Sequence, residues 1–317
     1  MKIRTAHILI PAIILVSQVC AAQRYEKVPL GDFENWTVRN IEESAILGGE
    51  TKTIYNVAPS DTIDANRPFN YSRTRWASSN AYAVVAGITK TSLSVSPDKG
   101  PSGLCAKLET CFASCKVAGL INVNVLVQGT LIWGKMKEPV SGISDPYSSM
   151  DWGIPFKDRP KAIVLDYCAT IPDTGTLVKG TTFKTQSFPG HDAAEVTLLL
   201  QHRWEDEQGN IHAERVGTAV YHISKSSSWV KKHRIPVIYG DATKSPDYKP
   251  YMDLLCNTRP LTAINSRGKS KVIKEEAWAD PSSEVTHAIL IISSGSCGAF
   301  TGAVGNVLKV DNILLEY

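Results

Sequence analysis

The sequence lacks the features that would place it in a membrane or on a nucleic acid. Its longest apolar run, residues 8–19, has about 12 residues, whereas a membrane-spanning helix needs about 20. No later stretch is long enough to cross a bilayer either. Lysine and arginine total 34 against 31 acidic residues, and the two signs are interspersed. We therefore expect neither a transmembrane segment nor a nucleic-acid partner.

Several catalytic and metal-binding signatures are also missing. No His-Glu-x-x-His spacing occurs among the seven histidines, and residues 294–298 follow a predicted strand without the helix that a serine-hydrolase elbow requires. Residues 105–115 carry three cysteines but no Cys-x-x-Cys pair, and no histidine follows at zinc-finger distance. We also find no internal repeat and no low-complexity linker. The simplest organisation is one domain over residues 23–317.

The first 22 residues have the pattern of a signal peptide. Lys2 and Arg4 precede the apolar run, and residues 20–22 are small enough for cleavage after Ala22. The mature protein is then expected in the periplasm, at the cell surface or outside the cell. A lipoprotein acylated on Cys20 is the alternative, but bulky Val19 stands where that signal needs a small residue, so a lipid anchor is disfavoured.

Six cysteines remain after this cleavage. An oxidising compartment would permit disulfides among them, but six cysteines allow 15 connectivities and the spacing selects none. Local disulfides and buried free thiols both stay open. The six are Cys105, Cys111, Cys115, Cys168, Cys256 and Cys297.

Strand patterns dominate the chain. Segments rich in β-branched and aromatic residues alternate with clusters of Gly, Pro, Asn, Asp and Ser, which predicts an all-β fold with few short helices. In residues 195–204 alternate side chains fall on opposite faces, and an acidic turn at 205–210 leads into a return strand, as in a hairpin. Residues 109–117 allow a short helix, and 42–70 are expected to form a long connection with short edge strands. The predicted strands are 161–171, 195–204, 211–223, 234–239, 285–293 and 307–317.

Two short segments at the ends of the chain carry carboxylates among apolar and aromatic residues. They are residues 31–36 and 310–317, and such segments are typical of the first and last strands of a jelly-roll sandwich. Strict alternation along the last strand places Asp311 on the same buried face as Ile313 and Leu315. A buried carboxylate must be paired, hydrogen-bonded or bound to a cation.

The order and spacing of several segments resemble the putative carbohydrate metabolism domain (PCMD) family, whose members are exported mainly by Bacteroidetes. This resemblance implies a jelly-roll β-sandwich of two antiparallel sheets, akin to carbohydrate-binding modules, and a role in glycan handling. It implies no catalytic residues. The matching segments are 31–36, 76–80, 103–110, 118–119, 129–136, 153–160, 300–306 and 310–312.

Aromatic residues are the first candidates for binding a glycan, because a sugar ring packs its C–H face on a flat side chain beside polar groups. Most of the seven tryptophans are expected in the core, including Trp36 and Trp133. Trp76 and Trp152 instead stand next to polar, loop-like residues. The predicted ligand-binding set is Trp76, Asn80, Asp151, Trp152 and Arg159.

An enzyme is the alternative to a binding protein. A glycoside hydrolase needs two carboxyl groups, about 5–5.5 Å apart for retention or about 6.5–9.5 Å apart for inversion. Asp151, Asp158 and Glu205 are the candidates, and the sequence does not show whether any two converge. A cell-envelope interaction protein without a sugar ligand is the third possibility. An exported glycan-binding or carbohydrate-metabolism accessory protein is the leading hypothesis.

The terminal acids also suggest a metal site. Carbohydrate-binding jelly rolls often hold a calcium ion near the first and last strands, so the resemblance implies that Glu34 and Asp311 could be ligands of a structural calcium ion. Lys309, two residues before Asp311, could pair with the carboxylate instead. No other cofactor is expected.

Overall fold

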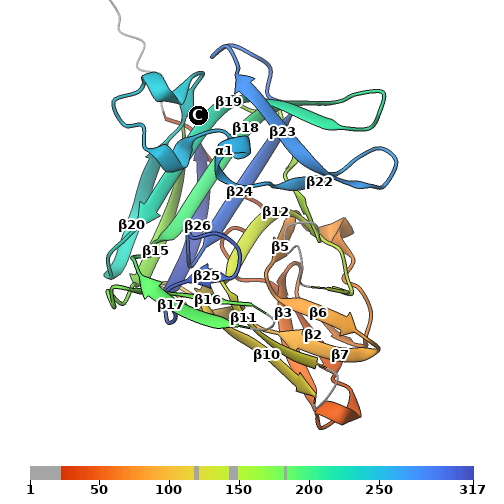
Figure 1. Ribbon diagram of the computed structural model, residues 1–317. Helices are drawn as coiled ribbons and strands as arrows, with labels where there is room; N and C mark the ends of the chain where they lie inside the picture. The colour runs from red at the N-terminus through yellow and green to blue at the C-terminus, as the bar shows by residue number, and fades with distance from the viewer. Residues whose placement is uncertain (1–22, 118–120, 143–148, 182–183) are drawn as a thin grey trace, which may run out of the picture.

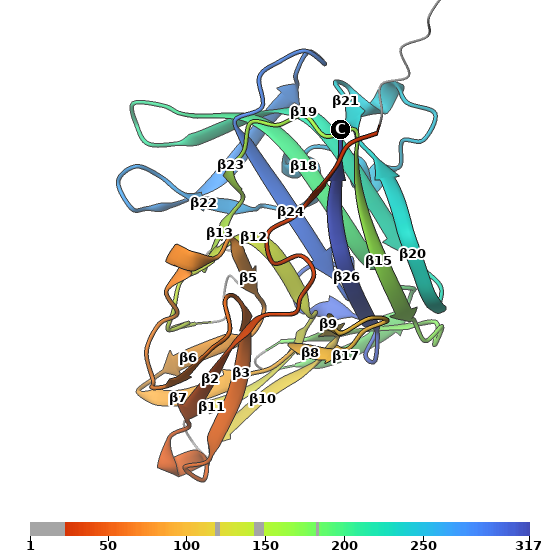
Figure 2. The ribbon, with the colours of Figure 1, turned by 180° about the vertical axis from the view of Figure 1, so that it is seen from behind.

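The computed structural model describes residues 23–117, 121–142, 149–181 and 184–317. Two large β-sheets face each other in the upper part of Figure 1, and smaller sheets and hairpins lie below them. Seen from behind in Figure 2, the sheet that contains β15, β26 and β20 stands in front of the one that contains β18, β19 and β24.

The first large sheet has six strands in the order β20-β15-β26-β9-β8, and β1 also pairs with β26. The last strand of the chain, β26, is therefore central. The bounds are β1 Tyr25–Lys27, β8 Val95–Lys99, β9 Leu104–Glu109, β15 Ala162–Thr170, β20 Ser227–Pro236 and β26 Val307–Glu316.

The second large sheet has ten strands in the order β13-β12-β24-β18-β19-β23-β22, with β5, β14 and β21 attached to β12, β24 and β19. The bounds are β5 Trp76–Ser78, β12 Thr130–Met136, β13 Met150–Trp152, β14 Ile154–Pro155, β18 Ala194–Glu205, β19 Ile211–Ile223, β21 Ile238–Tyr239, β22 Thr262–Ile264, β23 Ser270–Trp278 and β24 His287–Ser293.

The remaining strands form two three-stranded sheets and two hairpins. The sheets are β3-β2-β4, from Thr51–Val57, Trp36–Glu42 and Asp61–Asp64, and β17-β16-β25, from Thr185–Pro189, Thr176–Gly180 and Thr301–Gly302. The hairpins are β6 Ala81–Val85 with β7 Ile88–Ser92, and β10 Cys111–Val117 with β11 Ile121–Val127. The helical segments are single turns: η1 Ala45–Leu47, η2 Tyr71–Arg73, η3 Ala242–Lys244, η4 Pro250–Met252 and α1 Leu255–Thr258.

The predicted all-β sandwich is confirmed, and its strand pairings in the described ranges are antiparallel except for β19 with β23 and β2 with β4. The helix expected at 109–117 is wrong, because Cys111–Val117 pairs along its whole length with β11. Weak helix propensity is overridden by this cross-strand partner. The edge strands expected within 42–70 are present, because β3 and β4 form the two edges of the β3-β2-β4 sheet.

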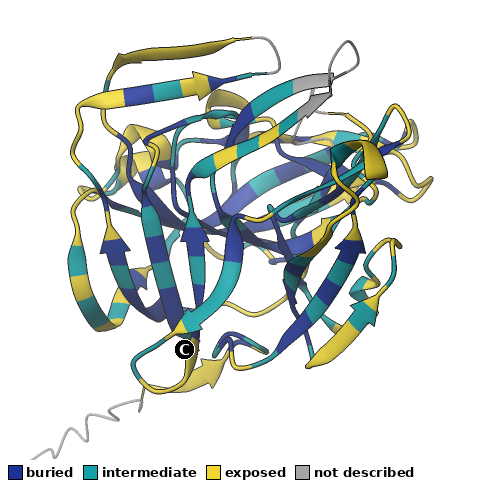
Figure 3. Ribbon diagram, turned by 90° about the horizontal axis from the view of Figure 1, so that it is seen from below, coloured by how far each residue is buried: buried dark blue, intermediate teal, exposed yellow. Residues whose placement is uncertain are grey.

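The main core lies between the two large sheets. Figure 3 shows the buried residues gathered on the inner strands and the exposed ones on the loops and the peripheral strands. The six-stranded sheet contributes Ile163, Leu165, Leu308, Val310 and Leu315, and the ten-stranded sheet contributes Val196, Leu198, Leu200, Leu290 and Ile292. Burying each of these side chains contributes about 1.5–3 kcal/mol, so this layer is the principal apolar contribution to stability.

The two terminal segments lie together, as the sequence suggested, although the first is not a strand. Strand β1 pairs with the end of β26, and the following turn continues the contact through a hydrogen bond from the Ile313 N–H to the Gly31 carbonyl oxygen at 2.9 Å. Phe33 then adopts a positive φ of 49° and is fully buried. Residues 31–36 therefore close one edge of the core as a tight turn before β2.

A bulge in β26 overturns the face predicted for Asp311. Asp166 pairs with Asp311, but Val164 pairs with Leu314, and Asn312 takes a positive φ of 53° between them. Because one extra residue shifts the alternation, Val310 and Ile313 both face the core and Asp311 faces outward. Asp311 is nevertheless only 2% exposed on the outer face of the six-stranded sheet.

The outer face of the ten-stranded sheet is covered as well. A second apolar cluster joins Leu199 and Ile289 of this face to Met252 and Leu255 of the segment that follows β21. Under this cover the Arg215 guanidinium pairs with the Glu275 carboxylate. Strand β18 is therefore buried on both faces over most of its length, and not on one face as the alternation of 195–204 predicted.

Candidate functional site

The structure removes Trp76 and Asn80 from the predicted ligand-binding set. Trp76 is fully buried, its indole N–H donates to the Pro29 carbonyl oxygen at 2.9 Å, and its ring contacts Trp133 with centroids 6.1 Å apart. The Asn80 amide is also buried, and it bonds the backbone of Tyr55 and Val95. Both residues connect the lower sheets to the core, so neither can meet a ligand.

The remaining predicted ligand-binding residues are also engaged within the fold. Trp152 on β13 is 4% exposed, and the neighbouring Asp151 carboxylate accepts a hydrogen bond from the Ile264 N–H at 2.9 Å. Arg159 lies on the surface, with its guanidinium 4.5 Å from the ring centroid of Tyr239 and a hydrogen bond to the Ser283 carbonyl oxygen at 2.5 Å. Asp151 and Trp152 share strand β13, and the other three residues lie on other segments of the chain.

The three candidate catalytic carboxylates have different hydrogen-bond partners in the described residues. Asp151 is held by β22, and Asp158 is exposed beside Tyr317. Glu205, at the end of β18, accepts hydrogen bonds from the backbone N–H and hydroxyl of Ser266 at 2.8 and 2.7 Å. Asp151 and Glu205 therefore both bond the segment 264–266, at positions two residues apart.

Glu34 and Asp311 lie near one another but are held differently. Both Glu34 carboxylate oxygens accept from the Leu104 N–H, at 3.1 and 3.2 Å, while Asp311 accepts from the Asn312 N–H at 2.7 Å. Lys309 pairs with Asp98, at 2.9 Å, and not with Asp311. The described ranges contain no group of three or more His, Cys, Asp or Glu side chains suited to a metal ion. A calcium ion at this place therefore stays a prediction.

The six cysteines in the described residues are free thiols. Cys105 on β9 and Cys168 on β15 flank β26 on opposite sides, so their backbones are about 9.5 Å or more apart, beyond the ~7 Å limit of a disulfide. Burial raises the pKa of the Cys105 thiol to about 12. The sequence left local disulfides and free thiols open, and the structure shows free thiols.

An exposed aromatic surface surrounds Trp204. Its side chain is 39% exposed, and it is the tryptophan that stands out as exposed in the described residues. The β18–β19 hairpin that carries it projects past the sandwich at the upper right of Figure 1. Trp204 continues the face of Leu198 and Leu200, but at this point the opposing sheet has ended, so the same alternation that buries the leucines exposes the indole.

The Trp204 ring is held by a stacked cross-strand neighbour. Trp204 pairs with His212 across β18 and β19, their ring centroids are 5.6 Å apart, and the planes meet at 13°. His202 lies on the same side of β18 with its ring 6.0 Å away. Cross-strand aromatic pairs of this kind restrict the ring and leave a flat platform at the edge of the sheet.

Two carboxylates fix the His212 ring. Its Nδ1 lies 2.6 Å from Glu276 Oε1, and its Nε2 lies 3.1 Å from Asp206 Oδ2. Hydrogen bonds to Glu276 and Asp206 raise the pKa of His212, while those from Asn210 and His212 lower the pKa of Asp206. The imidazolium form is thus favoured, and both ring nitrogens donate. The surface combines a flat indole with acidic and imidazole groups, which is a chemistry suited to sugar hydroxyls.

The sequence did not identify Trp204 as exposed. The strand pattern showed that Trp204 shares a face with Leu198 and Leu200, but it did not show where the six-stranded sheet opposite that face ends. The usable signal was local: Trp204 ends an alternating strand and is followed at once by the acidic turn at 205–210. A large aromatic next to a solvated turn is more exposed than one in the middle of a strand.

Sequence comparisons give no family for this chain. No known protein family matches it, and no curated protein does either. The resemblance to the PCMD family is therefore not confirmed and stays a prediction. In the described part of the chain, none of the helices has the length and apolar character needed to cross a membrane.

Solved structures include distant likenesses. One is a "putative glycoside hydrolase" from Bacteroides thetaiotaomicron, with 18% identity, a TM-score of 0.46, and coverage of 89% of this chain and 71% of that one. Another is a "putative glycoside hydrolase" from Bacteroides vulgatus, with 14% identity, a TM-score of 0.48, and coverage of 90% and 96%. A third is a family 11 carbohydrate-binding module from Clostridium thermocellum in complex with a β-1,3-1,4-mixed-linked tetrasaccharide, with 12% identity, a TM-score of 0.29, and coverage of 76% and 88%. At these scores the function has to be argued from this chain's own residues.

Proposed function

We propose that this chain is an exported, noncatalytic protein that binds a glycan on the surface formed by Trp204, His202 and His212. The observation that carries the proposal is the exposed indole, held flat against an imidazole ring that two carboxylates orient. A fixed aromatic ring loses little conformational freedom when it binds, so it can stack on a sugar at low entropic cost.

The chemistry around the indole supports a sugar over a purely apolar partner. His202 lies on the same strand face, and Glu276 and Asp206 carry carboxylate oxygens that can accept hydrogen bonds from hydroxyl groups. A glycoside hydrolase would need two carboxyl groups flanking a bond. Asp151 and Glu205 both accept hydrogen bonds from the segment 264–266, so this pair is the one to test for hydrolysis. The exposed, oriented indole of Trp204 favours the binding protein of the two hypotheses.

The test is a glycan panel with a matched pair of variants. The panel should hold soluble microbial, plant and host polysaccharides and include a mixed-linked β-1,3-1,4-glucan, the ligand class of the solved carbohydrate-binding module. For a polysaccharide that binds, Trp204→Ala should weaken the affinity about 30-fold, as expected when a central aromatic contact of about 2 kcal/mol is lost. Phe188→Ala removes an aromatic side chain of equal exposure, 39%, on the separate strand β17, and should leave the affinity unchanged.

Two results would count against this function. One is an absence of saturable binding across the panel, and the other is an unchanged affinity in Trp204→Ala. Chromatography of the incubated polysaccharide should show no shortened products, and the appearance of such products would favour the glycoside hydrolase.

A further inference from the structure

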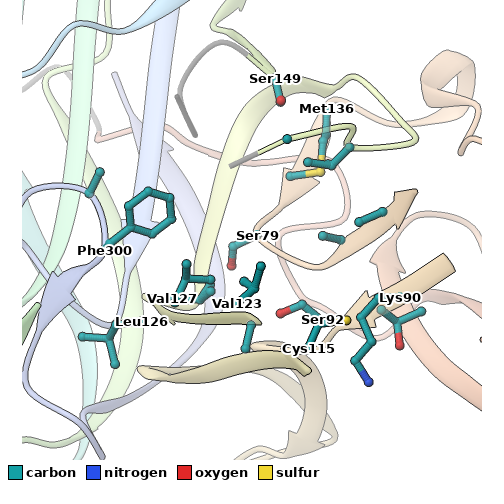
Figure 4. A pocket seen from close by; sticks show the side chains of 18 of the residues that line it. Ser79, Lys90, Ser92, Cys115, Val123, Leu126, Val127, Met136, Ser149 and Phe300 are labelled. Atoms are coloured by element: carbon teal, nitrogen blue, oxygen red, sulfur yellow. The ribbon is translucent and has the colours of Figure 1, made fainter. Parts of the chain in front are cut away.

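A cavity lies in the lower part of the molecule, away from the β18–β19 hairpin. It is a cavity of 270 Å³ between the β6–β7 and β10–β11 hairpins, closed at its other sides by residues of β12, β13 and the turn before β25. Figure 4 shows Met136 and Ser149 at one side of this cavity, Phe300 at another, and Val123 and Cys115 facing Ser79 and Ser92.

The two hairpins present apolar rows to the cavity. Strand β6 is apolar on both faces: Tyr82 packs with Ile41 and Ile54, whereas Ala81, Ala83 and Val85 line the cavity. A strand with two apolar faces is typical of one that is covered on both sides. The three cavity-facing side chains are nevertheless only half-buried, so this side of β6 lacks a cover within the described residues.

Strand β11 presents an apolar row to the cavity from the opposite hairpin. Val123, Val125 and Val127 line the cavity, and Ala113 of β10, which pairs with Val125, lines it too. Alanine and valine are short, so the two rows do not fill the space between the hairpins.

Several polar groups of the lining are already hydrogen-bonded inside the protein. The Ser79 hydroxyl bonds Ser94 at 2.7 Å and accepts from the Thr130 N–H at 2.8 Å, and the Gln128 amide N–H donates to the carbonyl oxygens of Cys297 and Thr301. Few partners are left for water or for a polar ligand. A cavity with such a lining excludes water and accepts an apolar guest.

Lys90 is the single charged residue in the described lining. Its ammonium bonds the Glu43 carboxylate at 2.8 Å, and its side chain is 32% exposed. Figure 4 shows Lys90 at the edge of the lining residues. A ligand must therefore be uncharged where it is buried, and any charged head group belongs at this edge.

We propose that this cavity binds an unbranched aliphatic chain. For comparison, an engineered apolar cavity in another protein that binds one benzene molecule measures ~150 Å³. Scaled by volume, the present cavity of 270 Å³ holds roughly 11 carbon atoms. Met136 and Met150, whose side chains adapt to irregular shapes, line the cavity and suit a flexible chain of this kind. This site is independent of the glycan-binding proposal.

The experiment uses the full mature chain and a fluorescent fatty acid, dansyl-undecanoic acid. Saturable fluorescence enhancement is expected. The variant Ala83→Leu with Ala113→Leu fills the cavity from both hairpins and should weaken the affinity at least tenfold. Ala45→Leu makes the same change at an exposed position outside the cavity, and Trp204→Ala removes the proposed glycan platform, so both should leave the affinity unchanged.

Thermal unfolding and near-ultraviolet circular dichroism establish that the filled variant is folded, and Ala83→Leu alone replaces it if it is not. Displacement by decanoate and by decyl maltoside then separates the two sources of an aliphatic chain, a free fatty acid or a glycolipid. Displacement by decanoate alone assigns the site to free fatty acids, and displacement by decyl maltoside alone assigns it to a glycolipid. An absence of saturable binding, or wild-type affinity in the folded filled variant, would overturn the proposal.

Discussion

Replacing Asp311 with asparagine is expected to stabilise the protein at neutral pH. Asp311 is 2% exposed, and the Asn312 N–H is its one hydrogen-bond donor in the described residues. Its immediate charged neighbours are the carboxylates of Asp166, Glu34 and Asp32. The ionised side chain is therefore buried beside like charges, and an amide of the same shape removes that cost while keeping the acceptor for Asn312.

The expected magnitude follows from the pKa of this carboxyl group. Burial, with a contribution from the neighbouring acids, raises the pKa of Asp311 from 3.8 to about 6. Each pKa unit corresponds to about 1.4 kcal/mol, so the ionised form costs about 3 kcal/mol of stability at pH 7. Because the folded protein holds this proton more tightly than the unfolded chain does, the cost disappears as the pH falls from about 6 to about 4. Asp311→Asn should therefore gain about 3 kcal/mol at pH 7 and almost nothing at pH 4.

The assay is urea unfolding of the wild type and the variant in chelator-containing buffer at several pH values. Asp98→Asn is the matched control, because a hydrogen bond from Lys309 lowers the pKa of Asp98 and makes that carboxylate stabilising above its unfolded pKa. The pair is partly exposed, so this control should lose about 0–1 kcal/mol at pH 7. A loss of stability in Asp311→Asn, or a difference from wild type that does not change between pH 4 and pH 7, would refute the reasoning.

Three further outcomes are expected. Glu195 is buried and bonds Arg259 at 2.7 and 2.9 Å; burial opposes ionisation, but the guanidinium prevails and lowers the pKa of Glu195 to about 2. Glu195→Gln should therefore lose about 3 kcal/mol of unfolding free energy at pH 7 in urea unfolding. This loss should shrink as the pH falls from about 4.5 to about 2. Because the pKa of His212 is raised, the contacts of its imidazolium with the two carboxylates are complete below the ordinary pKa of histidine and are lost as the pH rises through the folded pKa. The fluorescence of the stacked indole of Trp204 should follow this step in the wild type and not in His212→Gln. A pH profile of the variant that matches the wild type would contradict this assignment. If the calcium site expected from the sequence exists, added calcium should raise the melting temperature of the wild type and not that of Asp311→Asn, and chelator should reverse the rise; a melting temperature that calcium and chelator both leave unchanged would contradict the site.

Local patterns predicted much of the secondary structure. Residues 211–223 form β19 at the predicted bounds, and 195–204 lie within β18, because side chains that alternate over ten or more residues leave few alternatives to a strand. The acidic turn between them is also where the hairpin reverses. Residues 109–117 failed for the opposite reason: their own preference is weak, and the partner that decides them, β11, is a separate segment.

The candidate site was much harder to predict than the strands. Polar neighbours in the sequence made Trp76 look exposed, but it lies under the turn at 29–33, whose contribution to the core depends on the positive φ of Phe33. Trp204 follows a pattern typical of a buried strand and is exposed, because the opposing sheet is shorter than β18. Exposure depends on what covers a residue, and the cover comes from elsewhere in the chain.

The sequence by itself determined the all-β class and the main strands, because these depend on side-chain period and on turn residues close together in the chain. Only the tertiary structure decided the direction of Asp311, where one residue in the β26 bulge reverses the alternation. It also decided the exposure of Trp204 and the cavity between the two hairpins. Each of these depends on how far one sheet extends over another, and that is fixed by packing between residues that lie far apart in the chain.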